Sequence, residues 1–185
     1  MTDLAIAIWT KASARRKRLL SIVVVFIAAI VITGIGTLTP VAPQDAEQIN
    51  KDLNQTITTL NTQGDLTQYI FGNNLLICLL MFVPVIGPVL GLLIMFNTGT
   101  VIGAIAVSGG YSPLLALAAT FLTPVGWLEF AAYSTAMAES VWLFRRFMQG
   151  RGLRELRNLT IFVTISTVIL AVGAIIETAL INVGL

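Results

Sequence analysis

The residue with the clearest chemical potential is Glu129, a carboxylate inside a long apolar stretch. An ionised carboxylate in hydrocarbon is costly, so such a group faces the interior of a helix bundle, is protonated, or bonds a partner. Pro124 and Gly126 come just before it and predict a kink or break in the helix. Two interpretations follow: a structural hydrogen bond to backbone amides freed at the break, or a site for protons, cations or a partner.

The apolar stretches contain few other polar side chains. Glu139 comes shortly before a basic pair, and Glu177 lies about one turn from the end of the last apolar run, so both are expected near a membrane surface in structural roles. Asn73 opens one apolar run and Asn97 lies inside another. Buried amides commonly bridge membrane helices, for about 1–2 kcal/mol each.

Several kinds of chemistry lack the residues that they need. The chain has no histidine and a single cysteine, Cys78, which excludes a disulfide within the chain and the usual His or Cys sites for metal or haem. It has no glycine-rich phosphate loop with a lysine, no Ser–His or Cys–His arrangement, and no lysine within an apolar run. We therefore expect no catalytic residue, no metal and no cofactor, and a protein that is not an enzyme.

The elements that position Glu129 are long apolar runs. Hydrophobic residues make up 56% of the chain and charged residues 11%, whereas soluble domains average about 25% charged residues. Because a span needs about 20 mainly apolar residues, the sequence predicts an all-α, polytopic transmembrane bundle of about five spans. The predicted spans are 19–38, 69–90, 91–109, 113–144 with a break near Pro124-Gly126, and 159–183.

Basic residues predict the direction of the spans. One basic block precedes the first span, and a second group, beginning at Arg145-Arg146, precedes the last. Such clusters face the cytoplasm, and four intervening spans return the chain to that side. We expect a multi-pass cell-membrane protein with a cytoplasmic N-terminus, an outer C-terminus and segment 39–68 outside. A cleaved signal peptide is the alternative for the first run, but Pro40 and Pro43 crowd the place where cleavage would occur.

Two segments differ from the spans. Residues 1–18 form the expected cytoplasmic N-terminal segment, in which Asp3–Trp9 is apolar enough to rest on the inner interface. Residues 39–68 are polar, yet Ile49, Leu53, Ile57 and Leu60 recur at helical spacing. This segment is therefore predicted to be an amphipathic helix ending near Gly64, either lying over the bundle or lipid or docking a partner. Residues 19–185 then form a single membrane domain.

Three motifs give the chain a resemblance to a known family. They are Phe71-Gly72-Asn73-Asn74, then Asn97-Thr98-Gly99 with Gly103, and Pro124-Val125-Gly126-Trp127-Leu128-Glu129. Together they resemble the stage II sporulation protein M family of multi-spanning membrane proteins. The resemblance covers about residues 15–185 and implies five spans. It makes Glu129, Asn73, Asn97 and Gly126 the best-matched positions, and these form the candidate intramembrane polar site. The family's histidine position is Val125 here, and Thr98 separates the family's Asn-Gly pair.

Two classes of function are consistent with these features. The first is a non-enzymatic scaffold or accessory subunit of a membrane complex, which the sequence favours narrowly. The alternative is a small transporter or channel that uses Glu129 at a discontinuous helix. Expected partners are the lipid bilayer and either other membrane proteins or further copies of the chain. No nucleic acid is expected, because the arginines are few and topology already explains them.

Overall fold

The described part of the chain, residues 13–184 in a computed structural model, is all α-helical and contains no strand. This confirms the all-α prediction, while the predicted interfacial segment Asp3–Trp9 lies outside the described residues. The helices are α2 (Ala14–Thr37), α3 (Pro43–Gln63), α4 (Leu66–Met81), α5 (Ile86–Gly109), α6 (Pro113–Thr120), α7 (Pro124–Met148) and α8 (Gly152–Asn182).

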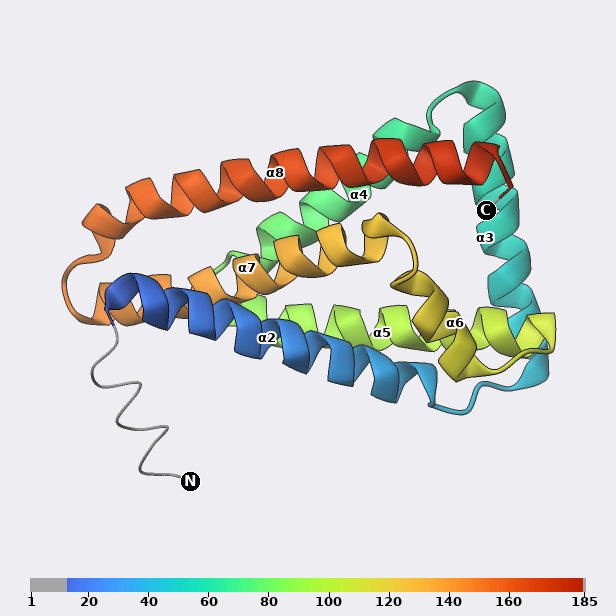
Figure 1. Ribbon diagram of the computed structural model, residues 1–185, viewed down its shortest axis with the longest axis horizontal. Coiled ribbons are helices and arrows are strands. Elements are labelled where there is room, and N and C mark those ends of the chain that lie inside the picture. The colour runs from blue at the N-terminus through green and yellow to red at the C-terminus, as the bar shows by residue number, and fades with distance from the viewer. Residues whose placement is uncertain (1–12, 185) are drawn as a thin grey trace.

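The helices form a bundle with two distinct ends (Figure 1). The start of α2 and the connection from α7 to α8 lie at one end, and α3 stands across the other, steeply inclined to the long helices. Within the described residues, three helices are long and apolar enough to cross a membrane: α2, α5 and the Glu155–Asn182 part of α8. The bent pair α6–α7 counts as a fourth if it is one broken span, and α4 is a shorter apolar helix. The predicted number of about five spans is therefore approximate.

The boundary between the second and third predicted spans was wrong. Helix α4 ends at Met81 and α5 begins at Ile86, so the break falls at 82–85 and not after residue 90. Pro84 disfavours helix for the residue before it, whereas Pro88 lies in the first turn of α5, where a missing N–H is tolerated. Ser140 donates a hydrogen bond of 2.6 Å to the carbonyl of Val83, which satisfies a backbone group at the break.

The predicted break near Pro124 is present. Helices α6 and α7 meet at 80° across residues 121–123. The indole of Trp127 donates to the carbonyl of Phe121 at 2.9 Å, so a side chain of α7 satisfies an acceptor at the end of α6. At Gly126 an added Cβ would lie 2.3 Å from the carbonyl oxygen of Thr120, which means that the bend needs a residue without a side chain there.

The terminal spans begin earlier than predicted. Helix α2 starts at Ala14 and α8 at Gly152, so both include charged residues before their apolar runs. At α2 the side chain of Ser13 accepts a hydrogen bond from the backbone N–H of Arg16, which caps the helix ahead of its apolar run. Segment 39–68 contains α3, which ends where Gly64 adopts the left-handed conformation with φ 79°.

Helices α2 and α5 pack closely along a seam of small residues. A Cβ added at Gly99 would lie 2.0 Å from the carbonyl oxygen of Thr33, and one at Gly103 would lie 2.5 Å from that of Thr37. On the facing helix, a Cβ at Gly36 would lie 2.1 Å from the carbonyl oxygen of Phe96. Each glycine therefore meets rigid backbone of the other helix, which is the close approach that such small residues permit in membranes.

The first prediction tests this seam. Gly99→Ala should lower the free energy of unfolding by about 1–3 kcal/mol, because the new methyl group has no room and the backbone must shift. The measurement is thermal unfolding of the purified protein in mild detergent.

Gly72→Ala provides the matched control. Gly72 lies on α4 with nothing within 4 Å of an added Cβ. This change should leave stability unchanged or raise it slightly, because alanine favours helix. Equal stability of the Gly99 and Gly72 variants would contradict the steric role of the seam.

Candidate functional site

A cavity of about 590 Å³ lies between α3 and the bundle. The side of α3 that carries the apolar stripe lines it, and residues of α4, α5, α7 and α8 complete it. The apolar lining residues are Ile49, Leu53, Ile57, Leu60, Leu66, Tyr69, Ile70, Val101 and Ile181, and the polar ones are Asp52, Thr56, Asn73, Asn74, Thr98, Glu129 and Glu177. Five helices thus contribute to one mixed apolar and acidic space.

The acidic side of the cavity is formed by Glu129 and Glu177. Glu129 lies in the second turn of α7, just beyond the bend, and the side-chain amide of Asn74 on α4 donates a hydrogen bond to its carboxylate. Glu177 lies on α8, and Asp52 adds a third carboxylate from α3. No lysine or arginine is among the residues that line this cavity. The cavity therefore brings three carboxylates together with neutral amides and hydroxyls and no basic side chain.

Helix α3 is held over the cavity at both ends. Near its beginning, the amide of Asn50 donates to the hydroxyl of Ser108 at 3.0 Å. Near its end, the amide of Asn61 donates to the side-chain oxygen of Asn182 at 2.8 Å. These contacts connect α3 to the ends of α5 and α8, and the apolar stripe of α3 lines the same cavity as Glu129 and Glu177.

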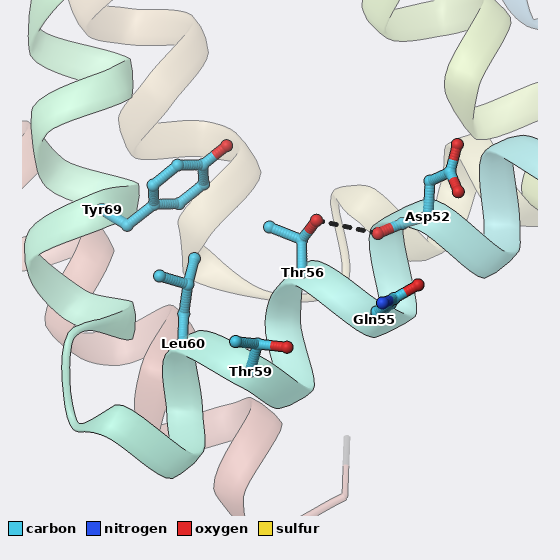
Figure 2. A pocket seen from close by; sticks show the side chains of 6 residues that line it. All are labelled: Asp52, Gln55, Thr56, Thr59, Leu60 and Tyr69. Carbon is cyan, nitrogen blue, oxygen red and sulfur yellow. Dashed lines mark hydrogen bonds between the residues drawn. The ribbon is translucent and has the colours of Figure 1, made fainter.

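A second hollow of about 420 Å³ adjoins the cavity between α3 and α4. Figure 2 shows Thr56 and Leu60 pointing from α3 toward Tyr69 on α4. Its lining residues are Asp52, Gln55, Thr56, Thr59, Leu60 and Tyr69, of which four also line the larger cavity. This hollow is the side on which the cavity approaches solvent, because Gln55 and Thr59 are exposed.

The predicted site residues are brought together only in part. Glu129 and Asn73 both line the cavity. Asn97 is exposed on α5, where its neighbour Thr98 lines the cavity in its place. Gly126 packs at the bend and is not among the residues that line the cavity.

Two residues of the cavity were missing from the predicted site. Asn74 provides the hydrogen bond to Glu129, and Glu177 is the second membrane carboxylate. The signal for Glu177 was the same as for Glu129, an acidic residue in an apolar run. Glu177 is far from Glu129 along the sequence, and nothing in the sequence indicated that α8 lies beside α7.

At the other end of the bundle, two carboxylates share one arginine. The Arg18 guanidinium of α2 is 3.1 Å from the carboxylate of Glu139 on α7 and also contacts Glu155 on α8. Asn158 donates to Glu155 at 3.0 Å. Glu139 is 2% exposed, so this ion pair is buried and fastens three helices to one another.

Among the described residues, no three acidic or cysteine side chains are grouped so that they could hold a metal ion.

Comparison with known proteins identifies the family. The profile described as stage II sporulation protein M matches residues 19–180. The chain therefore belongs to this family, as its motifs indicated. Neither the curated proteins nor the solved structures contain a significant match.

The second prediction concerns the shared arginine. Arg18→Met should lower the free energy of unfolding by about 3–5 kcal/mol, because removing one partner leaves buried carboxylates without their cation. Thermal unfolding in detergent measures the effect. Arg15→Met is the control: Arg15 is exposed on the same helix, and its removal should change stability by no more than about 0.5 kcal/mol.

A double variant separates charge from packing. Adding Glu139→Gln to Arg18→Met removes one of the uncompensated charges and should recover part of the lost stability. Purely additive losses would show that the charges do not interact.

Proposed function

We propose that this member of the stage II sporulation protein M family is a non-enzymatic accessory subunit of a membrane complex, and that the cavity under α3 receives a positively charged, otherwise apolar segment of a partner. The observation that carries the proposal is the composition of the cavity. It has three carboxylates and an extensive apolar lining without a basic residue.

The chemistry of the lining favours such a partner. Carboxylates at membrane depth are stabilised by an opposite charge, and Glu129 has one neutral amide as its hydrogen-bond donor. The apolar stripe of α3 would cover the aliphatic part of a lysine or arginine side chain, whose charged end would reach Glu129 and Glu177. A volume of about 590 Å³ falls within the usual range of ligand pockets, about 300–1,000 Å³.

Transport is the second candidate, supported by a different observation. Glu129 lies in the second turn of α7, just after the 80° bend between α6 and α7. Discontinuous helices with an acidic residue nearby are typical of ion sites in transporters. In this alternative Glu129 exchanges protons or cations with the cavity.

The third prediction distinguishes the two candidates. The protein in nanodiscs is titrated with a synthetic leucine-rich transmembrane peptide carrying one lysine near its outer end. A peptide with glutamine in place of the lysine is the comparison. The lysine peptide should bind at least tenfold more tightly, and Glu129→Gln should abolish most of that difference by removing the attracting charge. Glu47→Gln, at an exposed position of α3 outside the cavity, should leave it unchanged.

Ion flux and stability complete the test. Proton and sodium flux into proteoliposomes and thermal unfolding are measured for wild type, Glu129→Gln and Glu129→Leu. The Leu variant should be less stable by about 1–3 kcal/mol because the amide of Asn74 loses its acceptor. Transport would replace the accessory role if three results came together. The wild type would show flux, Glu129→Gln would abolish it at unchanged stability, and the lysine and glutamine peptides would bind equally.

The fourth prediction concerns orientation in the cell membrane. We propose that the basic end faces the cytoplasm, in agreement with the distribution of arginine and lysine. In a Cys78→Ser background, cysteines placed at Gln55 and Arg151 should react with an impermeant maleimide from opposite sides of the membrane. Both positions are exposed, and Arg151 is preferable to the adjacent Gly150, whose φ of 67° disfavours a side chain. Labelling of both from the same side would contradict this topology.

A further inference from the structure

A small basic hollow lies at the end of the bundle remote from α3. It has a volume of about 210 Å³ and lies between the beginning of α2 and the last turns of α7. Its lining residues are Ala14, Lys17, Trp142, Arg145, Arg146 and Gln149. We propose that this hollow binds the phosphate of an anionic phospholipid headgroup.

The arginines of the hollow are positioned by a fixed aromatic ring. Trp142 is 7% exposed, and its indole N–H donates to the hydroxyl of Ser21 at 3.2 Å. The guanidinium carbons of Arg145 and Arg146 lie 5.9 and 5.7 Å from the centre of this ring, within the range of cation–π contacts. A buried ring that holds two guanidinium groups beside one hollow reduces the entropy lost when they bind a ligand.

The charges of the hollow favour an anion. None of its lining residues is acidic, and three are basic. The nearest carboxylate described for Arg146 is that of Glu155, whose oxygen is 3.8 Å from Nε, beyond hydrogen-bond distance. This buried Nε has no hydrogen-bond partner within the described part of the chain. Planar guanidinium groups match the oxygens of a phosphate and bind it through paired hydrogen bonds.

The position of the hollow along the helices favours a lipid as the source of the phosphate. Lys17 comes just before the apolar run of α2, and Arg145 follows the apolar part of α7. The hollow is therefore level with lipid headgroups, where anionic phosphate is abundant. Basic pockets between transmembrane helices on the cytoplasmic side are known to bind such headgroups. This inference is independent of the cavity under α3 and of the function proposed for it.

The experiment measures lipids retained by the whole protein. Native mass spectrometry counts phosphatidylglycerol and phosphatidylcholine bound after release from mixed nanodiscs. Wild type should retain one phosphatidylglycerol in preference to phosphatidylcholine. Arg145→Gln should weaken that retention about tenfold, the expected result of losing charge-assisted hydrogen bonds to the phosphate. Arg145→Lys keeps the charge and loses the paired hydrogen bonds, so its retention should be intermediate.

Arg151→Gln is the matched control. It removes the same charge from an exposed position at the same end of the bundle, outside the hollow, and should retain phosphatidylglycerol like wild type. Equal losses in the Arg145 and Arg151 variants would overturn the site in favour of general surface attraction. Thermal unfolding of the wild type in phosphatidylcholine nanodiscs tests the other source of phosphate. Stabilisation by added inorganic phosphate, but not by added phosphatidylglycerol, would assign the hollow to a soluble anion instead.

Discussion

A carboxylate in a lipid environment needs a cation or hydrogen-bond donors beside it, and the two ends of this bundle meet that need differently. At one end, Arg18 contacts both Glu139 and Glu155, and Arg146 lies 3.8 Å from Glu155, so two arginines face two carboxylates. At the other end, Glu129 has the amide of Asn74 and shares its cavity with Glu177 and no basic side chain. The first arrangement pairs its carboxylates within the protein and fastens helices, whereas the second leaves its carboxylates without a basic partner among the residues that line the cavity.

The packing of the helices makes both arrangements possible. Glycines let the backbones of α2 and α5 come into contact, so this interface does not depend on polar side chains. The polar residues of α7 can therefore serve the two ends separately. Glu139 points toward α2 and α8, while Glu129, ten residues earlier, lies under α3. Because of the bend, α7 does not extend along the full length of the bundle. Helix α6 packs beside α5 in the remaining part.

The sequence was sufficient to predict features that depend on neighbouring residues. The apolar runs, the stripe beginning at Ile49 and the break at Pro124 are local signals, and each corresponds to an observed helix or bend. The contact of Asn74 with Glu129 and the sharing of Arg18 depend on which helices lie side by side, and hydropathy carries no such information. The boundary at 82–85 was missed because Pro84 and Pro88 look equivalent in the sequence, although one ends a helix and the other lies in the first turn of the next.

The way in which α3 is held has a consequence for the kinetics of access to the cavity. Its two connections, Asn50 to Ser108 and Asn61 to Asn182, are hydrogen bonds between neutral groups. Dissolved salt weakens such bonds little, whereas it screens the attraction between exposed charges. Added salt should therefore slow the arrival of a cationic ligand without loosening the helix that covers the cavity.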